Sequence, residues 1–205
     1  LYRSNDFGET YYSCNGGYVT SQFYASFSNS MQDSIFCLGG LQDNRSAFYQ
    51  GTTAWYKTFV GDGFTCAINS QNDNICYTEY SYGDIYRSGN RGVSWSNIGP
   101  PGAGNASNYC FAAPFISTRA NPNILYVGGT NLYKSTTGSG SWVSVGILGA
   151  KALSMDASAT SSDTVYIGTI PVINSQDAKI YKLTGSTLTD VSNGQIPNRY
   201  PTDIH

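Results

Sequence analysis

Three acidic residues in the first half of the chain could take part in acid–base chemistry. Asp43 lies in the short polar segment Gln42-Asp43-Asn44, directly after an expected strand. Two carboxylates about 5–9.5 Å apart can hydrolyse a glycosidic bond, one as acid and the other as base or nucleophile. Asp62 and Glu79 are the candidates for a partner of Asp43. Asp and Asn also stabilise turns by bonding backbone amides, so a purely structural role for the segment stays open.

Aromatic residues near these acids in the sequence could bind a sugar. Trp55, Tyr80 and Tyr82 follow Asp43, and Tyr77 lies close to them. An aromatic ring offers a rigid apolar plane that can stack on a pyranose ring. The alternative is ordinary packing between layers, because aromatic residues also dominate protein cores. We expect any ligand site to be lined by Gln42, Asn44, Trp55, Asp62, Tyr80 and Tyr82.

A recurring phrase indicates how the chain positions these residues. Residues 1–11 read LYRSNDFGETY, residues 85–95 read IYRSGNRGVSW, and a weaker copy at 132–142 reads LYKSTTGSGSW. Each copy opens with an apolar–Tyr–basic strand, passes through a small polar turn and closes on an aromatic residue. Ser, Asp and Asn bond neighbouring amides in turns, and Gly supplies the positive φ that a tight hairpin needs. Repetition at such intervals indicates a modular array.

A second repeated pattern predicts the strands that precede each hairpin. A polar turn followed by a β-branched or aromatic run recurs at residues 28–40, 69–77, 118–129 and 158–168. Such runs are typical of strands. Together the two patterns predict four-stranded antiparallel units with essentially no helix. We expect Tyr86, Tyr133 and Tyr181 to occupy equivalent positions in them.

The recurring phrase resembles the Asp-box, S-x-D-x-G-x-x-W, of BNR-repeat β-propellers such as sialidases, sortilins and xyloglucanase-type glycoside hydrolases. The first copy has Tyr in place of Trp, the second has Asn in place of Asp, and the third lacks the acid and has Ser139 in place of Gly. In those families the motif joins the third and fourth strands of a blade, opposite the active site. The resemblance therefore implies a structural role for Ser4, Asp6, Gly8, Ser88, Asn90, Gly92, Trp95, Ser135 and Trp142.

Further segments are similar to the sortilin-like or xyloglucanase-like repeats of secreted Bacteroidetes-type proteins. The likeness rests on residues 22–24, 39–44, 55, 60–64 and 194–204. In xyloglucanase-type enzymes a catalytic Asp lies in a loop after a second strand, within Arg-Thr-Asp-Val-Gly-Gly. The resemblance assigns that role to Asp43 if the chain is a hydrolase, although no Gly-Gly follows Asp43. It also implies an extracellular or cell-surface location.

Two functions follow as expectations. The first is a secreted or cell-surface propeller that binds a glycan or protein partner through loops at one end. The second is a xyloglucanase-type glycoside hydrolase that acts on a β-glucan by paired carboxylates. We favour binding, because a fold by itself does not carry an active site. Neither function calls for a cofactor.

The repeats predict an all-β propeller of about four complete blades with half-blades at both ends. The expected blades are residues 18–60, 62–98, 108–146 and 150–192, within a single propeller segment of residues 1–205. Residues 1–14 would supply the third and fourth strands of one blade, and residues 201–205 would open another. Because half-sheets have edges prone to pairing, we favour part of a larger propeller over a closed five-bladed ring. The rest of that propeller is therefore an expected partner.

Composition favours an exported all-β protein. Charged residues make up 12% of the chain, against about 25% in typical soluble domains. The net charge of −2 gives no footprint for nucleic acid, and no apolar run approaches the roughly 20 residues of a membrane span. The five cysteines lack metal-ligand spacing, so we expect no metal site. Cys66 and Cys76 flank an expected turn, which leaves open either a cross-strand disulfide or free buried thiols.

Overall fold

The computed structural model describes residues 2–14, 16–17, 21–24, 27–170, 178–194 and 199–204. Within these ranges all regular structure is β, with no helix. The strands form four sheets of four strands each and one separate two-stranded hairpin. No helix in this described part of the chain could therefore span a membrane.

Each four-stranded sheet is built from four consecutive strands, which pair as antiparallel neighbours in chain order. The first sheet contains β3 (Phe27–Asn29), β4 (Phe36–Leu41), β5 (Arg45–Gln50) and β6 (Tyr56–Phe59). The second contains β7 (Cys66–Ile68), β8 (Cys76–Glu79), β9 (Ile85–Ser88) and β10 (Ser96–Asn97).

The third and fourth sheets repeat this arrangement. The third contains β11 (Phe115–Ser117), β12 (Leu125–Gly128), β13 (Asn131–Ser135) and β14 (Trp142–Ile147). The fourth contains β15 (Ala152–Ala157), β16 (Thr164–Thr169), β17 (Ile180–Thr184) and β18 (Thr187–Asp190). The polar turns of the second sequence pattern join the first and second strands of every sheet.

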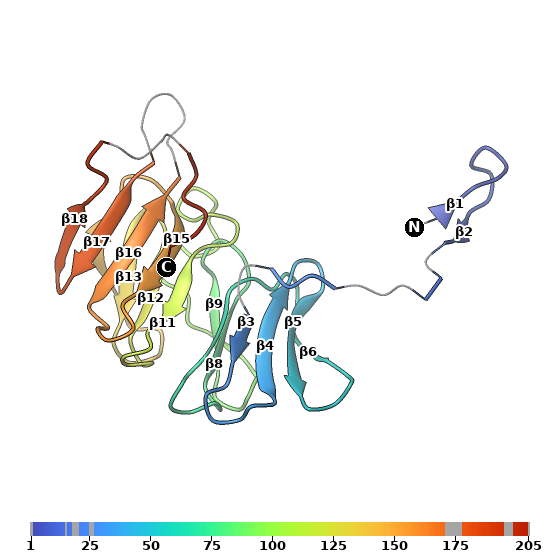
Figure 1. Cartoon of the computed structure of the whole chain (residues 1–205), viewed down its shortest axis with the longest axis horizontal. Coiled ribbons are helices and arrows are strands. Elements are labelled where there is room, and N and C mark those ends of the chain that lie inside the picture. Colours follow the sequence, from blue (N-terminus) through green and yellow to red (C-terminus); the bar gives the residue numbers. More distant parts are fainter. Residues whose placement is uncertain are drawn as a thin grey trace.

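The sheets follow one another as blades of a β-propeller (Figure 1). Their first strands lie side by side, with β3 next to β7, β7 next to β11, and β11 next to β15. Successive residues of a strand face opposite sides of its sheet, so each sheet can bury side chains against both neighbours. The main buried side chains are Phe36, Leu38, Phe48 and Ile68 between the first and second sheets, Tyr77, Ile85, Phe115 and Leu125 between the second and third, and Tyr126, Leu132, Val165 and Ile167 between the third and fourth.

The expected repeat of tyrosines is present in the strand pairing. Tyr86, Tyr133 and Tyr181 each lie in the third strand of a sheet. The residues that precede these tyrosines pair with Glu79, Gly128 and Gly168, respectively, in the second strand of each sheet. The three sheets therefore share one register.

The first copy of the recurring phrase closes a turn through its own side chains. Ser4 Oγ accepts a hydrogen bond from the amide of Gly8 at 2.8 Å, and Asp6 Oδ1 accepts one from the amide of Thr10 at 2.9 Å. The Ser4 hydroxyl also donates to Asp6 at 2.6 Å. These hydrogen bonds, with that of the Ser4 hydroxyl the most important, hold the pKa of Asp6 well below its usual range.

The second copy makes the same hydrogen bonds with Asn in place of Asp. Ser88 Oγ accepts from the amide of Gly92 at 2.9 Å, and Asn90 Oδ1 accepts from the amide of Ser94 at 2.9 Å. The Ser88 hydroxyl donates to Asn90 at 2.9 Å. The third copy differs, because the Ser135 hydroxyl donates to the carbonyl of Ser139 at 2.7 Å.

The two-stranded hairpin contains β1 (Tyr2–Arg3) and β2 (Tyr12–Ser13). Figure 1 shows it lying apart from the four blades. At the other end of the chain, residues 201–204 form no strand, whereas the sequence predicted an opening strand there. They lie instead against the fourth sheet, where the carbonyl of Pro201 accepts a hydrogen bond from Ser154 Oγ at 2.5 Å. His205 lies outside the described residues.

The disulfide considered between Cys66 and Cys76 is absent. The register explains this, because Cys66 pairs with Thr78 while Cys76 pairs with Ile68. The two cysteines are therefore offset along neighbouring strands and do not face each other. Burial raises the pKa of each thiol to about 12.

Candidate functional site

The turn between β4 and β5 places three of the predicted site residues at one end of the first sheet. Gln42, Asp43 and Asn44 are all exposed there. Asp43 has a φ of 61°, a left-handed conformation that Asp tolerates in turns. The side-chain amide of Asn44 donates to the carbonyl of Gln42 at 3.3 Å. Asn44 therefore stabilises the turn, while the side chains of the other two residues remain open to solvent.

The structure brings Asp43 next to Asp62, one of its two expected partners. Asp62 Oδ1 accepts a hydrogen bond from the amide of Asp43 at 2.7 Å. Within one aspartate the amide nitrogen and the carboxyl carbon are at most about 4 Å apart, so the two carboxyl groups lie within roughly 8 Å. That upper limit lies inside the range of about 5–9.5 Å used by paired carboxylates in glycoside hydrolysis. The same hydrogen bond also gives Asp62 a structural role in holding the turn.

Tyr80 covers the connection between the first two sheets. Its ring lies over Gly61, where an added Cβ would come within 2.4 Å of the ring. The ring also contacts Phe59 edge to face, with centroids 6.4 Å apart. Together with Val60 and Tyr86 these residues line a hollow of about 130 Å³. Tyr80, in the turn between β8 and β9, therefore packs against Gly61, the residue that precedes Asp62 in the connection between β6 and β7.

Four aromatic residues form a continuous line at this end, which we call the aromatic row: Tyr24, Phe64, Phe111 and Tyr82. Successive ring centroids along the row are 5.0, 4.8 and 5.3 Å apart, all edge to face. Tyr24 is 39% exposed and Phe111 38% exposed, while Phe64 is fully buried between them. Two exposed rings held by a buried one form a rigid apolar surface.

The aromatic row begins beside the Asp43–Asp62 pair. The amide of Tyr24 donates to the carbonyl of Gly40 at 2.8 Å, and the amide of Gly63 donates to that of Leu41 at 3.2 Å. Of the row, only Tyr82 was predicted as a site residue from the sequence. Phe64 and Phe111 carry no local signal, because they meet only when the second and third sheets pack together.

Glu79 lies beneath the aromatic row and connects its parts. Oε1 of its carboxyl group accepts hydrogen bonds from the amides of Gly83 at 3.1 Å and Ala113 at 2.7 Å, which lie close to Tyr82 and Phe111 in the sequence. Its carbonyl accepts one from the amide of Phe64 at 3.1 Å. A single residue thus fixes three of the four segments that present the row.

Glu79 occupies a position where other sheets have glycine. The register aligns Glu79 with Gly128 and Gly168, at which an added Cβ would come within 2.5 Å of Ala152 and within 2.7 Å of Pro201, respectively. The connection that follows the second sheet is longer than those after the first and third, and its Ala113 amide binds the carboxylate directly. The long connection leaves room for a glutamate that the other sheets could not hold.

The environment of Glu79 keeps it neutral over much of the physiological pH range. The residue is 0% exposed, and burial raises the pKa of its carboxyl group to about 8. Its second oxygen, Oε2, has no hydrogen-bond partner among the described residues. A fully buried carboxyl group cannot contact a polymeric ligand, so Glu79 does not serve as the second catalytic carboxylate in this arrangement. Its contacts give it a positioning role instead.

Trp55 does not join the other candidates. It lies in the loop between β5 and β6, at the end of β5 opposite to Asp43. Its ring packs against Tyr49, Phe23 and Phe27, with centroids 5.4, 5.0 and 5.9 Å away. The sequence predicts Trp55 and Tyr82 at the same ligand site, but the structure separates them.

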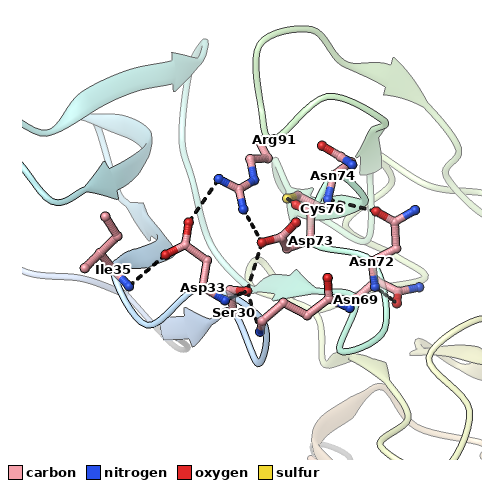
Figure 2. Close-up of polar contacts among 10 residues, drawn as sticks. Ser30, Asp33, Ile35, Asn69, Asn72, Asp73, Asn74, Cys76 and Arg91 are labelled. Atoms are coloured by element: carbon pink, nitrogen blue, oxygen red, sulfur yellow. Dashed lines mark hydrogen bonds and ion pairs between the residues drawn. The ribbon is translucent and has the colours of Figure 1, made fainter.

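A polar cluster at the opposite end of the first two sheets links them to each other (Figure 2). Arg91, in the second copy of the recurring phrase, forms ion pairs with Asp33 at 3.1 Å and with Asp73. Ser30 Oγ donates to Asp73 at 3.1 Å, and the Arg91 guanidinium lies 4.9 Å from the ring centroid of Phe36. Asp33 and Ser30 belong to the first sheet, so the cluster holds the two sheets together.

Larger hollows lie elsewhere. Those of about 380, 610 and 730 Å³ run along the first strands of the sheets and are not lined by Asp43, Asp62 or the aromatic row. In the described part of the chain, no group of three or more His, Cys, Asp or Glu side chains could hold a metal ion. What the site offers chemically is therefore an aromatic surface beside a pair of carboxylates.

No protein-family model matches this chain, and no curated protein matches it. Solved structures do match. An ancestral GH74 enzyme superposes with a TM-score of 0.68 and 16% identity, covering 97% of this chain and 29% of that one.

Two further GH74 structures are similar. The GH74 enzyme of Niastella koreensis has a TM-score of 0.64 at 16% identity, covering 86% of this chain and 31% of that one. The GH74 xyloglucanase of Xanthomonas campestris has a TM-score of 0.58 at 12% identity, covering 77% and 28%. This chain thus spans less than a third of the length of these enzymes. At such low identity the likeness shows the fold, a β-propeller of four-stranded blades like that of the GH74 enzymes.

Proposed function

We propose that this chain is part of a secreted or cell-surface β-propeller that binds a polysaccharide through the aromatic row and the adjoining Asp43–Asp62 pair. The observation that carries the proposal is the pairing of two exposed rings, Tyr24 and Phe111, across the buried Phe64. Flat rings stack on sugar rings, and exposed polar side chains such as Gln42 can bond the hydroxyl groups at their edges. The low content of charged residues supports export.

We assign the turns at residues 4–11 and 88–95 to the Asp-box. The support is the set of hydrogen bonds that the two turns share, from Ser4 and Asp6 in one and from Ser88 and Asn90 in the other. In this assignment Gly8, Gly92, Trp95, Ser135 and Trp142 are structural. The turn at residues 88–95 follows β9, the third strand of the second sheet, and therefore lies at the end of that blade opposite to the aromatic row.

Glycoside hydrolysis is the second candidate function, and a specific contact favours it. Asp62 binds the amide of Asp43, which brings two carboxyl groups within reach of one glycosidic bond. The GH74 enzymes with a similar fold include one named as a xyloglucanase. In this reading Asp43 and Asp62 would share the roles of acid and base, and the aromatic row would hold the chain of sugars.

The test of binding is affinity electrophoresis of the 205-residue chain through gels that contain xyloglucan, mixed-linkage β-glucan or no polysaccharide. The proposal predicts retardation in at least one polysaccharide gel, and loss of that retardation when both exposed rings are removed in Tyr24→Ala/Phe111→Ala. Unchanged mobility of the original chain in every gel, with its fold verified by circular dichroism, would contradict polysaccharide binding and leave a protein ligand to be sought.

A further inference from the structure

The first sheet has an aromatic face that no other sheet covers among the described residues. Leu38 and Phe48 face the second sheet and pack in the core between the two. Tyr49, next to Phe48 in β5, must point to the other side, because successive residues alternate. Tyr49, Trp55, Phe27 and Phe23 contact one another on that side, and Trp55 and Phe27 are exposed. We call this the open face.

The other sheets show how such a face is normally covered. Trp95 of the second sheet donates its indole N–H to Thr58 Oγ1 of the first sheet at 2.9 Å. Trp142 of the third sheet donates in the same way to the carbonyl of Ile98, just after β10 of the second sheet. Each tryptophan thus ties its own sheet to the end of the fourth strand in the sheet before it.

The position of the acceptor follows a rule. Thr58 lies three residues after Trp55, and Ile98 lies three residues after Trp95. The strand register makes Trp55 and Trp95 equivalent, because Ala47 and Tyr86 occupy the same position in the third strands of their sheets. Trp55 lies two residues before the fourth-strand partner of Ala47, and Trp95 lies two residues before that of Tyr86. In both cases the acceptor lies three residues after the aromatic residue that directly precedes the fourth strand of the preceding blade; it is the Thr58 hydroxyl in one case and the Ile98 carbonyl in the other.

The hairpin of β1 and β2 fits the same register. Tyr2 pairs with Ser13, and Tyr11 lies two residues before Ser13, which makes Tyr11 the equivalent of Trp55 and Trp95. Three residues after Tyr11 is Cys14. The same spacing makes Cys14 the residue equivalent to Thr58 and Ile98, and Trp55 is the tryptophan of the first sheet equivalent to Trp95 and Trp142.

The length and stability of the hairpin agree with this placement. Thirteen residues separate β2 from β3, and the connections between later sheets contain 6, 17 and 4 residues. A two-stranded hairpin alone is marginally stable in water at best. Tyr2, Tyr11 and Tyr12 of the hairpin are exposed, and large exposed apolar surfaces mark interaction sites. The hairpin and the open face therefore both expose apolar side chains, and each could cover those of the other.

We propose that the β1–β2 hairpin docks on the open face of the first sheet as the outer half of a preceding blade, with the Trp55 indole N–H donating to the carbonyl of Cys14. Tyr12 then faces the aromatic cluster of Phe27, Tyr49 and Trp55. The occupant is the chain's own hairpin, and the docked arrangement differs from the separated one in Figure 1 by a movement of residues 2–14.

Amide hydrogen exchange of the 205-residue chain, read by mass spectrometry, tests the proposal. Peptides from residues 2–14 should exchange at least tenfold more slowly than the same peptides in an unfolded reference. Trp55→Ala should abolish this protection, and Trp55→Phe, which keeps the ring but lacks the N–H, should reduce it partly. Trp142→Phe removes the same kind of hydrogen bond elsewhere and should leave residues 2–14 protected.

Several results would overturn the proposal. One is free exchange of residues 2–14 in the original chain, and another is equal protection in the original chain and Trp55→Ala. A third is protection that vanishes on dilution together with a dimer, which would assign the open face to the hairpin of a second copy. Unchanged protection of β8, β12 and β16 in each variant verifies that the blades remain folded.

Discussion

The carboxyl group of Glu79 accepts a hydrogen bond from the amide of Ala113 at 2.7 Å, across the boundary between the second and third sheets. The matching positions in the third and fourth sheets are Gly128 and Gly168. Side chains of Ala152 and Pro201 pack close to these two glycines, whereas the second sheet has a buried acid at the same position. Because Glu79 also binds the amide of Gly83, its protonation state is coupled to the packing of the aromatic row.

Glu79 should make stability depend on pH. Burial raises the pKa of its carboxyl group from 4.5 to about 8 in the folded state. The folded chain therefore keeps a proton that the unfolded chain loses, so this contribution is complete below pH 4.5 and is lost as the pH rises through 8. At about 1.4 kcal/mol for each pKa unit, the loss is on the order of a few kcal/mol. Urea unfolding at a series of pH values measures it.

Variants of the two glutamates of the chain provide the test and its matched control. Glu79→Gln keeps the shape of the side chain but does not titrate, so its free energy of unfolding should fall less between pH 5 and 8. Glu9→Gln changes an exposed residue and should retain the pH dependence of the original chain. Parallel pH profiles for the original chain and Glu79→Gln would show that Glu79 is charged in both states.

The repeats made the fold predictable from the sequence. The phrase around Tyr86 and the phrase around Tyr133 give the same strand, turn and aromatic residue, and hydrogen bonds within each turn depend only on neighbours in the sequence. Such hydrogen bonds within a turn do not depend on how the turn packs against the rest of the fold. The strand order within each blade then follows from short connections between consecutive strands.

The candidate site was less predictable, because its contacts join distant segments. Asp43 and Asp62 were both candidates, but their contact depends on how the connection after β6 folds back onto the β4–β5 turn. Phe111 meets Phe64 only through the packing of two sheets. The sequence predicted Trp55 as a ligand residue only because it is aromatic. Asp43 precedes β5 and Trp55 follows it, so the two residues lie at opposite ends of that strand.

Loss of the turn hydrogen bonds should weaken the fold without affecting ligand binding. Asn90→Ala removes the acceptor for the amide of Ser94, made at 2.9 Å, and should lower the free energy of unfolding by about 0.5–2 kcal/mol, the scale of a lost capping bond. Thermal and urea unfolding measure this change. Retained stability combined with lost polysaccharide retardation would place Asn90 in a binding site and contradict its structural role.

The polar cluster between the first two sheets should contribute more than an exposed ion pair. Arg91→Ala leaves the buried Asp73 with only Ser30 as a side-chain partner, which should cost about 1–3 kcal/mol in the free energy of unfolding. The exposed pair of Lys179 and Asp190, 2.9 Å apart, provides the control. Lys179→Ala should cost less than about 1 kcal/mol. Equal costs for the two variants would show that the cluster is no more than a surface pair.

Hydrolysis and binding can be separated at the carboxylate pair. Asp62→Asn keeps an oxygen for the amide of Asp43 but removes a charge, and Asp43→Asn removes the other charge. If the chain hydrolyses a β-glucan, each variant should release reducing ends at least a hundredfold more slowly, the scale of lost acid–base catalysis. Asp163→Asn, in an exposed turn of the fourth sheet, should keep the original rate. Equal rates for all variants would remove the pair from the chemistry.

Isothermal titration calorimetry with a β-glucan that retards the chain in the gel is the most direct test of the aromatic row as the ligand surface. Phe111→Ala removes an exposed ring at the centre of the row, and Tyr166→Ala removes a ring of matching exposure, 37%, from the fourth sheet. Phe111→Ala should weaken binding about tenfold, the effect of losing roughly 1.4 kcal/mol, while Tyr166→Ala should leave the affinity unchanged. Equal affinity in Phe111→Ala and the original chain, with both folded, would contradict polysaccharide binding by the aromatic row.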